Sequence, residues 1–370
     1  MVEALKKMDK KILIIVGIII LLPILIIVFL AIIQACGNSK ITPEKYEERM
    51  IVAVQNYFED TVGLPSKEGE TREVELSTLV GREYIKSTGD LIGDNTCLGS
   101  VTVRRNGSTV SENKGGYLNY IANLECKDYK TNTLINNLME DLTTTGSGLY
   151  QLNNYYVYKG DEVNNYVKFF DKDYRIMNID ENGIVKLIKA ESESLDRYWD
   201  NKYNIDVNDI YGKNIYADSA ILKYLMDDYN NVKVISNTAK EHIVSKDVCI
   251  DSRDLNNGAI GDYSCSTKLE NQVISLIDVT DYAKASLDMD CNSIYSKSCR
   301  NYNYLKDLNL MSWTLNAVSN NTYQVYYLSN GIIRSQEASK YHNYNLVIYI
   351  DGTENIASGD GTFEAPYVIK

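Results

Sequence analysis

An uninterrupted apolar segment near the N-terminus, from Ile12 to Ile33, constrains this chain more than any other feature. The segment contains no charged residue and is long enough to cross a hydrocarbon layer of about 30 Å as a helix. Pro23 lies within it, where membrane helices tolerate a kink. Four lysines between Lys6 and Lys11 precede it. The positive-inside rule therefore keeps the N-terminus in the cytoplasm and places the rest of the chain outside.

We predict a cytoplasmic tail over residues 1–11 and a transmembrane helix over residues 12–35, with the lipid bilayer as its partner. A cleaved signal peptide is one alternative, but its apolar core would span only about 7–15 residues. A lipoprotein signal is the better alternative, because the sequence around Cys36 loosely matches a lipobox, although Gln34 fits that motif poorly. The sequence leaves open whether Cys36 carries a lipid. Either way, most of the chain is expected outside the cytoplasm.

The composition is that of a folded protein. The 370 residues are 44% hydrophobic and 24% charged, which argues against overall disorder and allows more than one domain. The net charge of −12 argues against nucleic-acid binding, which needs a basic surface. The chain has 30 Tyr and only 2 His. That bias, together with abundant Asn, is consistent with an AT-rich genome.

Six of the seven cysteines lie in the predicted exterior part, and an even number there predicts disulfides. No Cys-x-x-Cys pair occurs and neither histidine is near a cysteine in sequence, so no zinc site is expected. Many pairings are possible for six cysteines. Local spacing favours Cys97 with Cys126, Cys249 with Cys265, and Cys291 with Cys299.

Residues 40–132 predict a small α/β domain. Thr42 and Pro43 are a typical N-cap and first helical residue, and this helix should end near residues 63–65. A second short helix is expected over Ser77–Ile85. The strand-like segments Cys97–Arg105 and Tyr117–Cys126 alternate apolar and polar residues. A hairpin between them would bring Cys97 opposite Cys126 and so supports that disulfide.

Residues 133–148 predict a short helix followed by a flexible linker rich in Thr, Ser and Gly. Residues 149–370 predict a β-rich domain with one clear helix over Ala217–Tyr229 and a helix or strand–helix over Val273–Ala285. Residues 180–183 carry a hairpin signal. The expected strands are Tyr155–Lys159, Tyr166–Phe170, Tyr174–Ile179, Ile184–Lys189, Met311–Asn316, Thr322–Leu328, Gly331–Ser335, Tyr344–Ile350 and Tyr367–Ile369.

The sequence shows no catalytic constellation. A serine-type triad needs a His base, but His242 and His342 stand in no motif, and we expect both in surface or loop positions. Paired cysteines cannot act as nucleophiles. Residues 288–292 resemble the first half of a calcium loop, but Ser293 replaces its glycine and Cys299 its final glutamate. We therefore predict no catalytic, cofactor-binding or metal-binding residues.

Three Tyr- and Asn-rich stretches have two interpretations. Rigid Tyr and adaptable Asn make binding surfaces in antibody loops. The alternative is that composition and the β propensity of Tyr explain them. The stretches are Asn301–Tyr304, Asn320–Tyr327 and Tyr341–Tyr349.

Several stretches carry a resemblance that spans most of the exterior chain. They are Lys45–Pro65 with Val74–Ile85, Cys97–Val103, Leu124–Thr131, Tyr155–Gly160, Asn164–Val167, Tyr174–Ile176, Asp180–Ile188, Trp199–Asn204, Ser358–Thr362 and Pro366–Ile369. In these the chain resembles uncharacterised, membrane-anchored surface proteins of low-GC Gram-positive bacteria. Such proteins have one N-terminal membrane helix, a small Cys-paired module and a C-terminal β-rich module.

The small module also resembles a pilin head, although the prepilin cleavage signal is missing. The C-terminal module resembles C-type-lectin or formylglycine-generating-enzyme-like folds. Tyr174 stands where that group usually has Trp, and Asn345–Ile348 replaces its usual Arg-Pro-Val-Ile run. The lectin-type calcium signature is absent. The resemblance to the formylglycine-generating enzymes would make Cys291 and Cys299 an active-site pair, but nothing around them matches, and a structural loop closure is preferred.

The expected protein is thus of the α+β class, with a transmembrane helix, a small pilin-head-like domain and a larger lectin-like domain. We expect a non-enzymatic binding or adhesion protein, anchored by a single membrane pass with its bulk extracellular, that uses loops within residues 196–345. Its ligand is unidentified and could be a glycan, a peptide or a cell-wall polymer. The alternatives are a structural envelope or pilus-like assembly component, and an enzyme acting on envelope polymers. An enzyme of that kind would use paired acids, and 50 Asp and Glu residues single out no pair.

Overall fold

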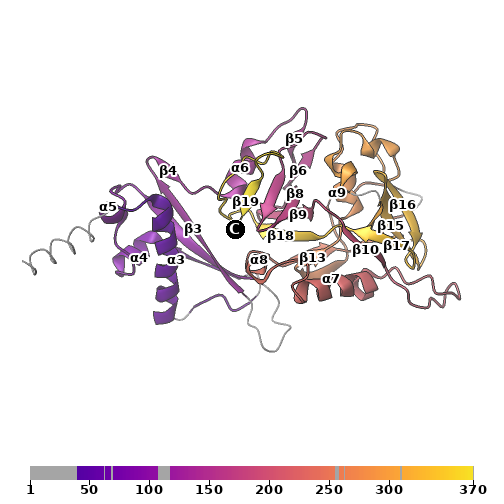
Figure 1. Cartoon of the computed structure of the whole chain (residues 1–370), viewed down its shortest axis with the longest axis horizontal. Helices are drawn as coiled ribbons and strands as arrows, with labels where there is room; N and C mark the ends of the chain where they lie inside the picture. The colour runs from indigo at the N-terminus through magenta and orange to yellow at the C-terminus, as the bar shows by residue number, and fades with distance from the viewer. Residues whose placement is uncertain are drawn as a thin grey trace, which may run out of the picture. The chain divides into compact units, whose positions relative to one another are not determined.

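The computed structural model describes residues 40–369 except 62, 68–69, 107–116, 255–257, 262 and 309–310. It is an α+β structure in which strands predominate, as predicted (Figure 1). The expected cytoplasmic tail and transmembrane helix, residues 1–35, lie outside the described residues. Within the described part, no helix is both long enough and apolar enough to cross a bilayer.

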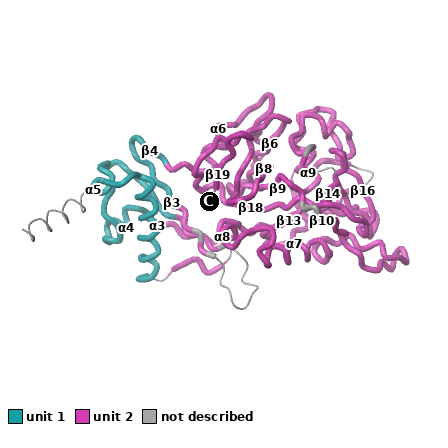
Figure 2. The backbone as a smooth tube through the Cα atoms, viewed as in Figure 1, with its two compact units in different colours: residues 1–61, 74–101, 122–130 teal, residues 62–73, 102–121, 131–370 magenta. Residues whose placement is uncertain are grey.

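The chain divides into two compact units (Figure 2). Unit 1 includes the described residues up to Thr61 together with Val74–Val101 and Ala122–Lys130, and unit 2 holds Val62–Glu73, Thr102–Ile121 and Thr131–Lys370. The expected linker over 133–148 therefore counts with unit 2. It contains helix α6 (Leu134–Glu140). Leu134 and Leu138 share one helical face, and both are fully buried in the core of unit 2.

Unit 1 is built on helix α3 (Pro43–Asp60), which begins where the sequence predicts. The hydroxyl of Thr42 accepts a hydrogen bond from the backbone N–H of Lys45 at 3.4 Å. Helix α4 (Leu76–Gly81) is shorter than the predicted Ser77–Ile85, because Glu83 adopts a left-handed φ of 62°. Helix α5 (Thr88–Leu91) follows it.

The predicted hairpin forms the middle of a four-stranded sheet. Its order is β1 (Thr71–Glu75), β2 (Leu98–Asn106), β3 (Tyr117–Cys126) and β4 (Tyr129–Lys130). The predicted alternation is seen at Val101 and Val103 of β2 and at Ala122 and Leu124 of β3, which are fully buried; their neighbours Ser100 and Ile121 are buried as well. The alternation predicted from the sequence therefore sets which face of these strands is covered.

Unit 2 contains an eight-stranded sheet whose main path is β13-β18-β9-β8-β6-β5. Strand β7 pairs with β8, and β19 pairs with β7 in parallel. The strands are β5 (Gly148–Leu152), β6 (Tyr155–Lys159), β7 (Tyr166–Phe169), β8 (Lys172–Ile179), β9 (Ile184–Lys189), β13 (Ile274–Ser275), β18 (Val347–Asp351) and β19 (Tyr367–Ile369).

A second sheet of unit 2 has the order β10-β17-β14-β15-β16, and β11 and β12 form a separate pair. The predicted strand Tyr344–Ile350 is divided between the two large sheets, because Asn345 leaves the ladder and bonds through its side chain to Ser312 and Lys189. The strands are β10 (Glu193–Tyr198), β11 (Lys246–Cys249), β12 (Lys268–Gln272), β14 (Met311–Ala317), β15 (Gln324–Ser329), β16 (Ile332–Glu337) and β17 (Tyr341–Tyr344).

The helices of unit 2 cover these sheets. Helix α7 (Ala220–Asn230) packs against β10 and β13 (Figure 1) and buries Ile221, Leu222 and Leu225, as predicted. The segment predicted as a helix or strand–helix is β13 followed by α9 (Val279–Lys284). The remaining helical segments are η1 (Tyr216–Asp218), α8 (Asn237–Glu241), η2 (Lys297–Arg300) and η3 (Tyr304–Asp307). One hydrophobic core, with Trp199 and Trp313 fully buried in it, joins both large sheets.

Candidate functional site

The six described cysteines form the three pairs that local spacing favours. Disulfides join Cys97 to Cys126, Cys249 to Cys265, and Cys291 to Cys299. Two groups of Cys and Asp side chains lie close enough to hold a metal ion, Asp94 with the first pair and Asp251 with the second. Both use disulfide sulfurs, which are not the thiolates that bind metals. These groups are therefore structural in the oxidised chain.

Of the two histidines expected in surface or loop positions, His242 lies in the turn at the end of α8, whereas His342 does not. His342 lies in β17 and is buried, with its ring stacked on that of Tyr327. Its Nε2 lies 3.0 Å from Oε1 of Gln336. Side chains of a strand alternate between its two faces, and position 342 falls on the buried face. A single His in the sequence does not indicate such burial. His242 is the C-cap of α8 and half-buried, with Nδ1 2.8 Å from Oε2 of Glu354.

The segment 288–292, which resembles a calcium loop, forms a turn in which nearby groups donate hydrogen bonds to the carboxylate of Asp288. One oxygen of Asp288 accepts the backbone N–H of Asp290 at 2.9 Å, and the other accepts the side-chain amide of Asn301 at 2.8 Å. These bonds lower the pKa of Asp288, with the Asn301 amide as the largest cause. Met289 is 94% exposed.

Most of the Tyr and Asn side chains in the three enriched stretches are structural. Asn303 is fully buried and donates to the carbonyls of Tyr282 and Cys299 at 2.8 and 2.7 Å. Tyr304 and Tyr326 are buried in the core. Packing in the core and hydrogen bonds to backbone carbonyls therefore account for these side chains.

An exposed apolar loop, residues 200–215, is the largest departure from this packed structure. It is the extended rose-coloured segment that leaves β10 in Figure 1. Ile205 is 79% exposed and Ile210 is 64% exposed. Five large hydrophobic side chains of this loop are exposed, namely Tyr203, Ile205, Ile210, Tyr211 and Ile215.

Buried polar side chains hold the base of the 200–215 loop. The amide of Asn204 donates to the carbonyl of Gly212 at 3.0 Å and to that of Thr322 at 3.1 Å. Asp200 is 1% exposed and accepts the backbone N–H of Lys213 at 2.8 Å. Asn214 donates to three carbonyls around β15. The loop therefore presents its apolar tip from a fixed base.

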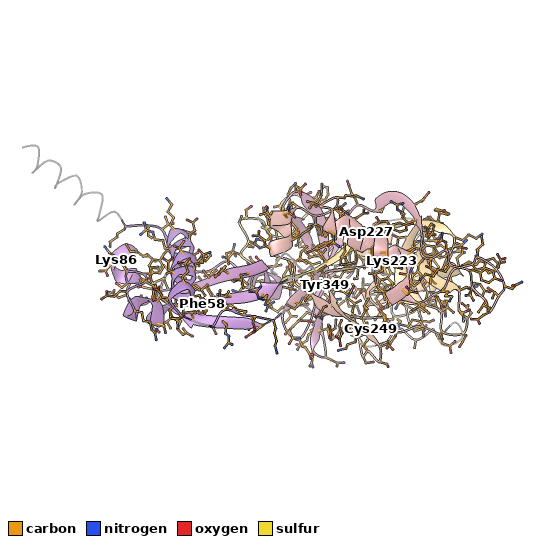
Figure 3. The ribbon with its side chains drawn as sticks, turned by 90° about the horizontal axis from the view of Figure 1, so that it is seen from below. Phe58, Lys86, Lys223, Asp227, Cys249 and Tyr349 are labelled. Atoms are coloured by element: carbon orange, nitrogen blue, oxygen red, sulfur yellow. A yellow bond between two sulfur atoms is a disulfide. The ribbon has the colours of Figure 1, made fainter. Side chains whose placement is uncertain are left out.

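A second candidate is a polar pocket of about 680 Å³. The β8–β9 hairpin, the β11–β12 pair and α9 line it, and two of its residues, Cys249 and Tyr349, are labelled in Figure 3. One of its lining residues is Asp281, the third residue of α9, which is buried. Oδ2 of Asp281 lies 2.6 Å from Nζ of Lys186, and Oδ1 accepts the amide of Asn178 at 2.8 Å.

Another acid of the polar pocket, Asp278, is hydrogen-bonded by its neighbours. It caps α9 through the N–H of Thr280 at 2.6 Å and accepts the amide of Asn316 at 2.9 Å. Arg253 lies 3.7 Å from it. Burial raises the pKa of Asp281, and the charge of Lys186 opposes that rise. Burial lowers the pKa of Lys186, but the charge and hydrogen bond of Asp281, with smaller contributions from Tyr349 and Asp278, together outweigh it and leave that pKa raised.

Sequence reasoning missed both candidates. Lys186 and Asp281 are separated by about a hundred residues, and only the fold joins them. The 200–215 loop lies inside the region expected to bind ligand, and its isoleucines in a polar, turn-rich segment were the one signal for it. No protein-family model, curated protein or solved structure matches the chain.

Proposed function

We propose that the chain is a membrane-anchored, extracellular binding protein without catalytic activity, and that the 200–215 loop makes the contact. The apolar segment 12–33 and the lysines before it support the anchoring. The three disulfides support an oxidising compartment.

The observation that carries the proposal is the exposure of Ile205 and Ile210. Isolated exposed apolar residues are common on protein surfaces, but a cluster on one projecting loop marks an interaction site. Folding does not need these side chains, because Asn204 and Asp200 hold the base of the loop. Exposing them costs solubility, so an occupant that covers them is the simplest account.

The chemistry of the loop favours a protein or peptide partner over a glycan. The exposed apolar area at its tip comes from Ile205 and Ile210, whose side chains offer no flat ring and no hydrogen bond. Tyr203 and Tyr211 flank it and supply rigid amphipathic area of the kind found at protein interfaces. A patch of this kind would bind through a few apolar anchors.

The finer fold assignment is part of the same proposal. The long helix α3 and the disulfide-closed sheet β1–β4 support a pilin-head-like module. The two large sheets of unit 2, with the long loop after β10, support a lectin-like module. In this scheme the small module leads from the membrane and the larger one carries the binding loop.

Binding of defined probes tests the proposal. The purified chain is applied to a peptide array, a glycan array and purified peptidoglycan, beside the double variant Ile205→Ser/Ile210→Ser. We expect a peptide ligand whose affinity falls at least about tenfold in the double variant, as loss of two apolar anchors implies.

Met289→Ser is the matched control, because it removes another exposed apolar side chain outside the loop. It should leave binding unchanged. Absence of binding on all three surfaces, or equal binding by the double variant, contradicts the proposal. Unchanged circular dichroism of each variant excludes misfolding as the cause.

A further inference from the structure

The polar pocket brings a lysine, an asparagine and a buried carboxyl group into one cluster. We propose that Lys186 and Asn178 become joined by an intramolecular amide bond, with Asp281 transferring the protons. This is a covalent modification site inside unit 2, independent of the 200–215 loop.

The two reacting side chains are cross-strand neighbours. Asn178 on β8 is the register partner of Lys186 on β9 in an antiparallel pair. Directly opposed residues of such a pair have Cβ atoms about 5 Å apart and project to the same face. A lysine side chain is long enough to span that gap, so an amide link between Nζ and the Asn178 side chain would join paired positions of the two strands, next to the register shift between Ile176 and Asn178.

Asp281 contacts both partners with separate oxygens. Its Oδ2 lies 2.6 Å from Nζ of Lys186, and its Oδ1 accepts the Nδ2 amide of Asn178 at 2.8 Å. One carboxyl group thus touches the nucleophile and the leaving group at once. That is the geometry required of a combined general base and general acid.

The environment also suits the reaction. Asp281 is 0% exposed, the Lys186 side chain is 14% exposed and Asn178 is 5% exposed. Burial by itself disfavours the charged form of each group, whereas their mutual attraction holds Lys186 as the ammonium. The proton therefore has to pass from Lys186 to Asp281 before the amine can attack. The hydroxyl of Tyr263 also lines the pocket, is buried, and has no hydrogen-bond partner among the described residues. It is a donor for the oxygen that becomes negative on Asn178.

The proposed step balances without any co-reactant. Asp281 takes a proton from the Lys186 ammonium, and the free amine attacks Cγ of Asn178. The tetrahedral intermediate collapses when Asp281 returns a proton to Nδ2. The Cγ–Nδ2 bond breaks, ammonia leaves and takes up the remaining proton as ammonium, and a secondary amide joins the side chains. The carboxylate of Asp281 is regenerated.

A nearby lysine serves as an internal comparison. Lys246 also pairs with a buried acid of the polar pocket, Asp180. The other oxygen of Asp180 accepts the backbone N–H groups of Asn182 and Ile184. This pair therefore has no side-chain amide to attack, and we expect no bond there.

Mass spectrometry of the full chain tests the proposal. The reduced, denatured protein should be lighter than its sequence by the mass of one ammonia molecule. Trypsin normally cuts after Lys186, but an acylated lysine is not a substrate. Digestion should therefore give one peptide, 176–189, that lacks one ammonia and keeps Lys186 uncleaved.

Three variants sharpen the result. Lys186→Arg and Asp281→Asn should both restore the full mass, the first by removing the nucleophile and the second by removing the proton carrier. Lys246→Arg should retain the loss of ammonia. Should either of the first two variants fail to fold, the measurement on the unaltered chain still decides the question.

Other outcomes overturn the proposal. A succinimide at Asn182, which precedes Gly183, also loses ammonia, but trypsin would still cut after Lys186 and release peptide 176–186. Loss of water instead of ammonia would place the bond between Lys186 and Asp281. Full mass with normal cleavage in the folded chain would show that the cluster is an ion pair only.

Discussion

The ring of His342 packs edge to face against that of Trp313, with centroids 4.4 Å apart. Tyr327 stacks on the imidazole at the same centroid distance. Burial among these rings lowers the pKa of His342 to about 4, because the charged form loses its hydration. The imidazole is therefore neutral at pH 7.

This environment predicts an acid-sensitive fold. The unfolded chain binds a proton at His342 near the ordinary histidine pKa of 6.5, whereas the folded chain does so only near 4. The contribution of His342 to stability is thus complete above pH 6.5 and lost as the pH falls toward 4. The full difference amounts to about 3 kcal/mol. His342→Phe should reduce the fall in unfolding free energy across that interval, measured by denaturant titration.

The pKa of the other histidine, His242, is shifted upward, in the opposite direction to that of His342. Burial lowers the pKa of His242, but the hydrogen bond and charge of Glu354 outweigh that effect and raise it. Its contribution is present below pH 6.5 and lost as the pH rises through the folded pKa. Since the chain has 2 His, NMR titration should give one imidazole above 6.5 and one near 4. Two midpoints near 6.5 would contradict both environments.

Removing the disulfides should have graded effects. The sequence separations are 29 for Cys97–Cys126 and 8 for Cys291–Cys299. Loop-closure entropy then gives about 3–4 kcal/mol for the first bond and about 2–3 kcal/mol for the second. Denaturant unfolding of the paired Cys→Ser variants measures this order. A non-reducing peptide map provides the control, because free thiols at these positions would remove the basis of the comparison.

Alanine substitutions at two glycines should distinguish the cost of backbone strain from the cost of a steric clash. Gly212 in the 200–215 loop has φ +80°, and a Cβ there would lie 2.2 Å from the carbonyl oxygen of Asp200. Gly146 has φ +71° with nothing within 4 Å. Gly146→Ala should cost about 1 kcal/mol, the left-handed penalty alone. Gly212→Ala should cost more and make the loop sensitive to limited proteolysis. Equal costs would show that the loop base adapts.

Asn204 should matter more than its exposed neighbour Asn201. Asn204 is 1% exposed and its amide bonds to Gly212 and Thr322. Asn204→Ala removes the side-chain donor from the carbonyl of buried Gly212, which costs about 1–3 kcal/mol. The carbonyl of Thr322 keeps the backbone N–H of Asn214 as a donor. Asn201→Ala should be near neutral, since surface changes stay within about 0.5 kcal/mol. Thermal unfolding of the two variants gives the comparison.

Local patterns predict much of this fold. Thr42 and Pro43 mark the start of α3 because capping is a short-range effect. Strands β6 and β9 begin and end at the predicted residues, since turn signals bound both segments. The pairing of Cys97 with Cys126 follows from the hairpin that joins their strands.

What the sequence could not provide depends on contacts between distant segments. Strand β10 lacks a clear alternation and pairs with β17, far along the chain. The burial of His342 depends on Trp313 and Tyr327, which come from two other strands. The cluster around Asp281 needs a hairpin and a helix to meet. Residue type alone carries no information about such contacts between segments that are far apart in the sequence.

The pairing pattern of the three disulfides also bears on how they form during folding. Each cysteine from Cys97 to Cys299 bonds either to the next cysteine along the sequence or to the one before it. If the part of the chain after the membrane segment enters an oxidising compartment in sequence order, each pair is exposed completely before the next pair emerges. Correct oxidation then follows from the order of arrival, and the exchange of wrong disulfides for right ones, a slow step in many secreted proteins, is not required.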